Sequence, residues 1–410
     1  MRHRDYRLFF AGQGVSMVGT WLQQVAMGWL AYRLSGSALL LGVIAFCSNA
    51  GILFLGSFAG VIADRVDRRR AIFVTQGLMA AQATLLALLT ALQAVEPWHL
   101  VVLALWMGLA NAFDIPVRQS LYVHFVGDRA DLANAIALNS FLVNAARVVG
   151  PALAGVLLAV TTEAVCFALN ALSFVAVFVA LARIRFPAHR AAGRTASLRE
   201  SWAEGLRYVA RFAPARALLL IAAVVSFTVM PYASLMPVHA KDVLAGGPRT
   251  LGWLLSAAGA GALASTLYLA RRESVVGLGR VIVGAAIAAG LALAAFGQVR
   301  ALPLALALMV VAGGGVILAA AASNTILQTV VSDDLRGRVA GFYTLAFLGV
   351  APLGNLAAGA LAQYAGAPTT FLVNGLACAA AGTWFLRQLP ALRAAIRPVY
   401  VKLGLVPADE

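Results

Sequence analysis

Residues 60–70, which read GVIADRVDRRR, separate two long apolar segments at about residues 38–63 and 71–93. These charges cannot lie in hydrocarbon, because each charged side chain at the centre of a bilayer costs at least ~2.5 kcal/mol. The stretch is therefore predicted to be a short hydrophilic turn between two membrane helices. Its arginines place the turn on the cytoplasmic side, where basic residues are enriched.

The composition of the whole chain agrees with this interpretation of one turn. Hydrophobic residues make up 62% of 410 and charged residues only 11%, whereas soluble domains are about 25% charged. A water-soluble globule is excluded. The apolar residues occur in runs of roughly 20, the length that crosses a hydrocarbon core of about 30 Å. Twelve spans are predicted, at about residues 7–33, 38–63, 71–93, 98–119, 133–160, 163–183, 215–240, 250–270, 279–298, 302–325, 336–363 and 369–388.

The basic residues are distributed unevenly over these spans. The net charge is +15, and most of the Lys and Arg residues fall in alternate turns, in the middle segment and in the two tails. Only four fall on the other side, namely Arg33, Lys241, Arg249 and Arg300. This asymmetry predicts that both termini lie in the cytoplasm. The preference for arginine, with Lys241 and Lys402 the two lysines among 31 basic residues, is consistent with a bacterial protein and hence with the inner membrane. The positive charge therefore reflects topology, and no nucleic-acid partner is expected.

The spans divide six and six around residues 184–214, the longest hydrophilic segment. Within it, Ser197 and Glu200 have the spacing of a capping box, and apolar residues follow at helical spacing. We expect a surface helix there. The predicted units are an N-terminal six-helix half at 1–183, this linker, a C-terminal half at 215–390 and a cytoplasmic tail at 391–410.

An internal repeat supports the division into halves. Residues 150–155 (GPALAG) resemble residues 354–359 (GNLAAG) at an offset of 204. The predicted fold is therefore an all-α membrane protein with twelve transmembrane helices, in two six-helix pseudo-repeats around a central cavity. In the first segment, small residues four apart also allow close packing of helices.

The twelve spans, the long middle segment and the turn together resemble the major facilitator superfamily over about residues 5–390. Segments 111–119, 134–140 and 146–155 further resemble a bacterial subgroup that includes the enterobactin exporter and relatives of macrolide efflux pumps. The resemblance implies export of a small organic molecule against proton entry. The turn matches the superfamily's loop 2–3 motif, but Asp67 replaces its second glycine. The residues of this gating motif are Gly60, Asp64, Arg65, Arg68, Arg69 and Arg70.

A cytoplasmic latch that favours the inward-closed state is the expected role of this turn. One departure from the superfamily concerns the fourth span, where many drug–proton antiporters carry an arginine. Residues 103–109 contain none, so the standard antiport mechanism does not transfer directly.

No constellation typical of a soluble enzyme occurs in the chain. A Walker turn is missing, so ATP does not drive this chain, and no cofactor is expected. The five histidines, His239 among them, fall at predicted span ends or in loops without metal-ligand spacing, and no metal site is predicted. The three cysteines lie far apart within spans and suggest no disulfide framework. Energy must then come from an ion gradient, unless the protein is a facilitator.

Asp114 is the one acidic residue predicted within a helix, near the inner end of the fourth span, and Arg118 follows on the same helical face. Three interpretations stay open. The pair could lock the inner gate together with the basic turn, or Asp114 could carry protons because a buried carboxyl is readily protonated. It could also be an ordinary ion pair.

Arg147 is the basic residue predicted deepest within a span. Ser140 and Asn144 lie on the same helical face, and an unpaired guanidinium there must face a cavity, an anionic ligand or a carboxylate. A role in substrate binding and a role in anchoring the helix remain equally open. Phenolate or siderophore-like substrates would suit this arginine. Other polar residues within spans could line the cavity, although a hydrogen bond between helices is the favoured role for each of them: Gln23, Gln24, Asn49, Asn111, Asn324 and Tyr232.

The sequence thus predicts a monomeric secondary transporter that exports a small organic molecule by alternating access, with protons as the coupling ion. Its partners are the substrate and the lipid bilayer. A proton-linked uptake carrier remains an alternative, as does a membrane protein that senses a ligand or handles lipid without transport.

Overall fold

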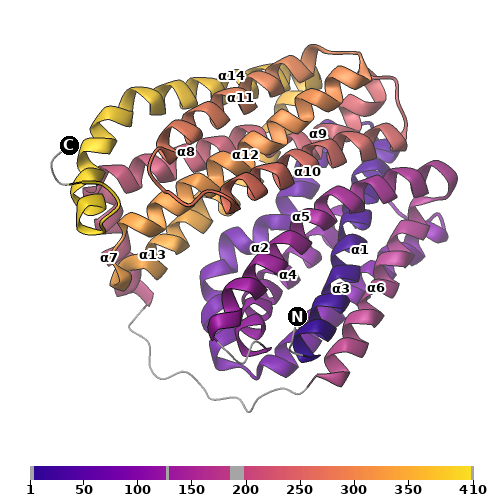
Figure 1. The fold of residues 1–410 in the computed structure, drawn as a ribbon. Coiled ribbons are helices and arrows are strands. Elements are labelled where there is room, and N and C mark those ends of the chain that lie inside the picture. Colours follow the sequence, from indigo (N-terminus) through magenta and orange to yellow (C-terminus); the bar gives the residue numbers. More distant parts are fainter. Residues whose placement is uncertain (1–3, 126–128, 185–197, 408–410) are drawn as a thin grey trace.

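The computed structural model describes residues 4–125, 129–184 and 198–407, and these residues form helices joined by short connections, with no strand among them (Figure 1). Within them, ten segments are long and apolar enough to cross a membrane. The protein is therefore an all-helical membrane protein, as the composition predicts. Hydrocarbon favours this architecture because a helix satisfies its backbone hydrogen bonds internally.

Six long helices form a first group, and the charged turn lies between two of them. The Ser37 side chain accepts a hydrogen bond from the Leu40 amide at the start of α2, and Asp67 caps α3 by accepting one from the Arg70 amide at 2.8 Å. Asp67, which stands where the superfamily's motif has its second glycine, is thus the N-cap residue of α3. The first group comprises α1 (Arg4–Ser35), α2 (Ala38–Arg65), α3 (Arg68–Ala91), α4 (Pro97–Phe125), α5 (Arg129–Val160) and α6 (Glu163–Arg183).

The remaining long helices form a second group. Gly366 interrupts α14 with φ 81° and ψ 157°, a conformation that favours glycine, and it lies where the sequence predicts a break between spans. The group comprises α8 (Ala213–Val229), α9 (Tyr232–Val238), the π-helix η1 (His239–Val243), α10 (Pro248–Ala270), α11 (Leu278–Gln298), α12 (Leu302–Val330), α13 (Asp333–Thr344), the π-helix η2 (Leu345–Gly349) and α14 (Ala351–Lys402).

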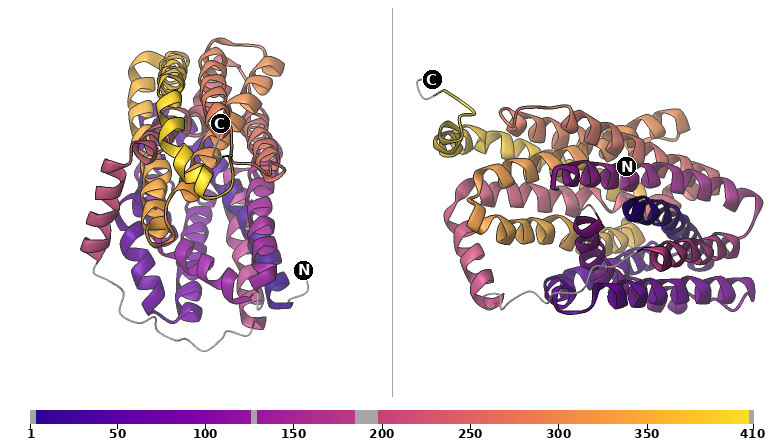
Figure 2. Two further views of the ribbon diagram at one scale, coloured as in Figure 1. Left: turned by 60° about the vertical axis from the view of Figure 1, so that its left-hand side comes forward. Right: turned by 60° about the horizontal axis from the view of Figure 1, so that its bottom comes forward.

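The helix α7 (Leu198–Arg211) forms in the middle segment and lies beside α13 of the second group (Figure 2). An ion pair of 2.6 Å joins Glu204 to Arg338, and Gly205 lies close against the Phe342 ring. The predicted linker helix is present, although Ser197 of its capping box lies outside the described residues. These contacts attach α7 to the second group.

The end of α14 extends beyond the predicted spans. The helix continues to Lys402, whereas the last span was predicted to end near residue 388 and residues 391–410 to form a tail. Leu392 and Ile396 bury their side chains on this extension, and burial of apolar surface stabilises the added turns.

Contacts between the two groups concentrate at one end of the bundle. Figure 1 shows the ribbons running apart toward the terminal end, which we define as the end with the start of α1, α7 and the end of α14. At the opposite end, α2 packs on α14, where a Cβ on Gly42 would lie 3.0 Å from the Gly359 Cα atom. Gly155 of α5 similarly meets Gly252 of α10. The two groups therefore meet through backbones that only small residues allow to approach so closely.

Side chains also connect the groups at the opposite end. The Tyr32 hydroxyl of α1 donates a hydrogen bond to the Asp242 carboxylate of η1, and the Lys241 ammonium lies 5.4 Å from the centre of the Tyr32 ring. Ser37 donates a hydrogen bond of 3.0 Å to Gln363 of α14. Polar contacts thus reinforce the glycine contacts at this end.

Candidate functional site

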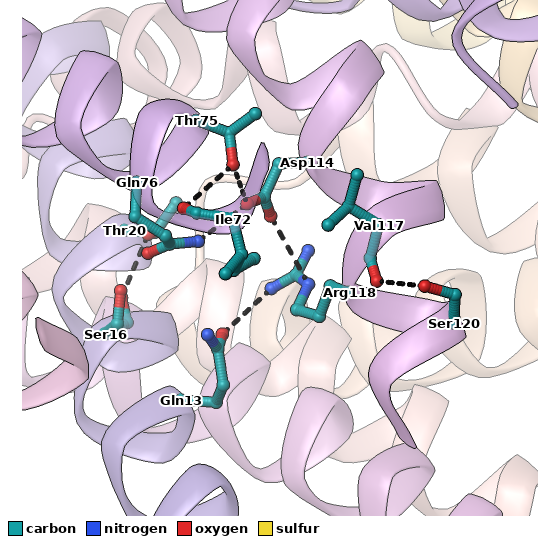
Figure 3. Close-up of polar contacts among 10 residues, drawn as sticks. All are labelled: Gln13, Ser16, Thr20, Ile72, Thr75, Gln76, Asp114, Val117, Arg118 and Ser120. Atoms are coloured by element: carbon teal, nitrogen blue, oxygen red, sulfur yellow. Dashed lines mark hydrogen bonds and ion pairs between the residues drawn. The ribbon is translucent and has the colours of Figure 1, made fainter. Parts of the chain in front are cut away.

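Asp114 is the centre of a buried polar cluster that joins α1, α3 and α4 (Figure 3). Its Oδ1 atom accepts hydrogen bonds from the Thr75 hydroxyl at 2.9 Å and the Gln76 amide at 2.7 Å. Its Oδ2 atom lies 3.4 Å from the Arg118 Nε atom, and Arg118 in turn donates to the Gln13 amide oxygen at 3.1 Å. The predicted pairing of Asp114 with Arg118 is therefore present in the structure.

The depth of these residues in their helices explains why they meet. Gln13 lies nine residues into α1 and Thr75 seven residues into α3, whereas Asp114 lies eleven residues before the end of α4. At 1.5 Å per residue, all of them are about 10–17 Å from the terminal end. Gln13, Thr75 and Gln76 were not singled out from the sequence, although their position in apolar spans at matching depth was a usable signal.

Several hydrogen-bonding atoms of this cluster lack a partner. Among the described residues, Asp114 Oδ2 has the ion pair with Arg118 but no hydrogen-bond donor, and Gln13 Nε2 and Gln76 Oε1 also lack partners. A buried polar atom without a hydrogen-bond partner raises the free energy of the folded state. A rearrangement that supplies the missing partners would therefore stabilise this cluster. Chemically, Oδ2 is the atom at which this carboxylate could take up a proton.

A cavity of about 540 Å³ connects the charged turn with this cluster. Asp67 and Arg70 of the turn line it, and so do Thr75 and Val117, which adjoin Asp114 and Arg118. The turn and the Asp114 cluster thus border one space between α2, α3 and α4. In the turn itself α2 ends at Arg65 and α3 begins at Arg68. The structure describes the backbone of Gly60, Asp64 and Arg65, but not the side chains of Asp64 and Arg65.

Arg147 lies near the middle of the bundle, between α5 and α1. Its guanidinium carbon is 5.8 Å from the centre of the Trp21 ring, a cation–π distance. Nε of Arg147 is buried without a hydrogen-bond partner among the described residues. No described contact joins Tyr232 of α9 to this arginine. Asp114 contacts Arg118 instead, so the structure does not bring Arg147 and Asp114 together in a described contact.

The backbone of Arg147 also lies where the two groups touch. A Cβ on Gly259 of α10 would lie 2.7 Å from the Arg147 carbonyl oxygen, and Ser256 donates a hydrogen bond of 2.8 Å to the Val148 carbonyl. The contact between α5 and α10 therefore runs from the opposite end to the depth of this arginine. Any movement of one group against the other changes the surroundings of its guanidinium.

The other predicted cavity residues have mixed environments. Asn144 donates to the Ser140 carbonyl at 2.8 Å, and Asn49 donates to the Ala45 carbonyl at 3.0 Å, so both bond within their own helices. Gln24 is exposed, and Asn111 is half-buried. Asn324 Oδ1 is buried without a described partner.

Gln23 joins three helices of the first group. It donates a hydrogen bond of 2.9 Å to Gln82 of α3 and accepts one of 2.8 Å from Asn170 of α6. All three residues are buried. This geometry favours the interhelical role over ligand contact for Gln23, and the sequence had not indicated its two partners.

His239 lies near the end of the membrane-crossing segment Ala213–Val243, where the sequence places it. Its side chain is nevertheless fully buried beside the rings of Phe296 and Phe371, at centroid distances of 4.2 and 5.4 Å. Phe296 belongs to α11 and Phe371 to α14. Neither ring nitrogen has a hydrogen-bond partner within the described part of the chain, and no cluster suited to a metal ion is found there either.

A buried ion pair and a half-buried arginine inside a bundle of membrane-crossing helices are typical of a membrane transporter. Comparison with known proteins narrows this class. The family described as transmembrane secretion effector matches residues 1–399, so the chain belongs to this family of the major facilitator superfamily, and the resemblance inferred from sequence is confirmed. It is a transporter and not an enzyme.

Two relatives and one solved structure illustrate the match. The multidrug efflux pump Tap of Mycobacterium tuberculosis is 30% identical over 395 residues, 93% of this chain and 91% of the pump. The staphyloferrin A transporter of Staphylococcus aureus is 25% identical over 376 residues, 90% of this chain and 92% of the relative. The crystal structure of the nucleoside transporter NupG superposes with a TM-score of 0.76 at 13% identity, covering 94% of this chain and 99% of NupG, which shows the shared fold.

Proposed function

We propose that this protein exports a small organic molecule across the bacterial inner membrane by alternating access, as a monomer with twelve membrane spans. Ten spans follow from length and hydropathy. The helix α1 adds an eleventh, and Gly366 divides the last apolar segment into two. The excess of arginine at the terminal end supports a cytoplasmic position for both termini.

The arrangement of the two groups carries this proposal. Residues 1–183 and 215–390 act as two halves joined by the linker, and their described contacts lie at the opposite end and down to Arg147. A bundle that is held together at one end and diverges at the other has the form expected of one end state of a rocking transporter. On the proposed orientation, the extracellular end is the closed one.

Arg147 is the proposed contact for the substrate. A guanidinium beside an indole, with an Nε atom that has no hydrogen-bond partner among the described residues, suits an organic anion with an aromatic or other apolar body. The relatives named as a multidrug efflux pump and as a staphyloferrin A transporter support a small organic substrate. Structural anchoring of α5 is the competing role, and it predicts that substrate affinity does not depend on the guanidinium.

Proton exchange is the proposed source of energy, and a specific observation favours Asp114 as the carrier. Its Oδ2 atom is buried and lacks a hydrogen-bond donor among the described residues, so protonation there would release Arg118 without breaking another hydrogen bond. The gating role is compatible with this step, since the cluster borders the same cavity as the basic turn. Loss of the ion pair would then loosen α4 beside the turn.

The test uses cells that lack their own major efflux pumps and express the protein. Accumulation of a panel of fluorescent organic anions and cations is measured with and without a protonophore. The proposal predicts lower accumulation of anions than in cells without the protein, an effect that the protonophore abolishes. The Arg147→Gln variant should lose this effect, whereas Arg300→Gln, in the connection between α11 and α12, should retain it. Raised accumulation would instead indicate uptake, and unchanged accumulation of every compound would contradict transport of this class.

A further inference from the structure

A second cavity lies away from the Asp114 cluster and from Arg147, in the second group at the terminal end. It is enclosed by the starts of α8 and α11 and by the last turns of α14, and its volume is about 340 Å³. Pockets that hold small ligands have volumes of about 300–1,000 Å³. Its size therefore permits a ligand, and its position separates it from the proposed transport route beside Arg147.

The lining of this cavity is apolar at its base. Leu389, Leu392 and Ile396 of α14 are nearly buried there, and they meet the buried side chain of Leu218 from α8. These residues explain why α14 continues past its predicted end. An apolar base of this kind favours a hydrocarbon chain over a fully polar ligand.

The rim of the cavity is basic. Arg280 comes from α11, and Arg393 and Arg397 lie one turn apart on α14. No ion-pair or hydrogen-bond partner is found for these three guanidinium groups in residues 4–125, 129–184 and 198–407, and none of the lining residues is acidic. Three exposed arginines that line one cavity, with no acidic residue in the lining, favour an anionic group there, most suitably a phosphate.

We propose that this cavity binds an anionic phospholipid of the cytoplasmic leaflet, with its phosphate at the three arginines and an acyl chain on the apolar base. Charge complementarity and the apolar base identify this occupant together, because a free phosphate would use only the rim. Basic pockets between helices on the cytoplasmic side are suited to anionic head groups. The orientation rests on the proposed function, but lipid binding does not depend on transport activity.

Bound lipid would connect α11 with the end of α14 and so brace the second group at its diverging end. The lipid contacts helices of the second group only, so it would stabilise that group without joining it to the first. The experiment therefore measures binding and stability rather than transport.

Purified full-length protein in neutral detergent is titrated with phosphatidylglycerol, phosphatidylcholine or inorganic phosphate. Bound lipid is counted by native mass spectrometry, and thermal unfolding is recorded on the same samples. We expect phosphatidylglycerol to bind and to raise the unfolding temperature, with weaker effects of phosphatidylcholine and none of phosphate. Each arginine removed should weaken phosphatidylglycerol binding by about fivefold.

The variants are Arg393→Gln with Arg397→Gln, the charge-preserving Arg393→Lys, and the control Arg387→Gln. Arg387 is exposed on the same helix but does not line the cavity. Only the double variant should lose binding strongly. Equal loss in the control variant, equal binding of phosphatidylcholine, or saturation by phosphate that blocks lipid binding would each overturn the proposal. Failure of export in cells would leave this binding result unchanged, so the two proposals fail separately.

Discussion

Replacement of Asp114 should destabilise the protein more than replacement of any other acid in a described ion pair. Asp114→Ala removes the acceptor of two hydrogen bonds and leaves Arg118, whose side chain is only 19% exposed, without its counter-charge. Removal of one member of a buried pair costs about 3–5 kcal/mol. Asp114→Asn keeps the shape and one acceptor oxygen, so its expected cost is about 1–3 kcal/mol.

Glu204→Gln provides the matched control, because it also removes a carboxylate from an ion pair. Glu204 is 50% exposed, and exposed pairs contribute only about 0–1 kcal/mol. The free energy of unfolding is measured for the three variants by tryptophan fluorescence in mixed detergent micelles. The expected order of destabilisation is Asp114→Ala, then Asp114→Asn, then Glu204→Gln. A cost for Asp114→Ala no larger than that of the control would refute the view that this cluster holds α1, α3 and α4 together.

Three further changes test separate contacts. Gly252→Val should impair transport, because a Cβ there would lie 2.5 Å from a backbone oxygen of α5. Gly284→Val has open space around it and should be tolerated, and efflux assays on both variants test this difference. Gln23→Leu leaves two buried amides without their partner and should lower the free energy of unfolding by about 1–3 kcal/mol, while Gln24→Leu at an exposed position should change it by less than about 0.5 kcal/mol. Tyr32→Phe removes a hydrogen bond at the opposite end and should raise the accessibility of that end to thiol reagents directed at an introduced cysteine. Unchanged labelling would contradict a contribution of this hydrogen bond to holding that end closed.

The sequence predicted the parts of the fold that depend on local composition. Apolar runs of membrane-crossing length placed the spans, and the break before residue 369 matches the Gly366 interruption of α14. The end of α14 was missed, because its apolar face at Leu392 and Ile396 is too short to appear as a span and gains its stability from packing against α8 and α11. Local patterns do not report such contacts between distant segments.

The candidate site was predictable to a similar extent. The spacing of four residues brought Asp114 and Arg118 together, because that distance is one helical turn. The donors Thr75 and Gln76 come from another helix, and the depth of a neutral polar residue in its span narrows its possible partners without identifying them. His239 shows the same limit, since the rings that cover it, Phe296 and Phe371, come from distant helices that the sequence pattern does not connect with it.

Alternating movement of the two groups is the central claim, and a pair of cross-links tests it most directly. In a variant with the native cysteines replaced, cysteines at positions 37 and 363 are joined by a reducible bifunctional thiol reagent, whose spacer replaces the reach of the Ser37 and Gln363 side chains that are hydrogen-bonded at 3.0 Å and so links α2 to α14. Cysteines at positions 33 and 163 would join α1 to α6 within the first group, where Arg33 and Glu163 form an ion pair of 2.9 Å.

Efflux of a transported fluorescent compound is then measured after cross-linking with this reagent and again after reduction. The account predicts that the cross-link between the groups stops efflux and that reduction restores it, while the cross-link within the first group leaves efflux intact. Continued efflux with the link between positions 37 and 363 fully formed would contradict alternating access in this protein.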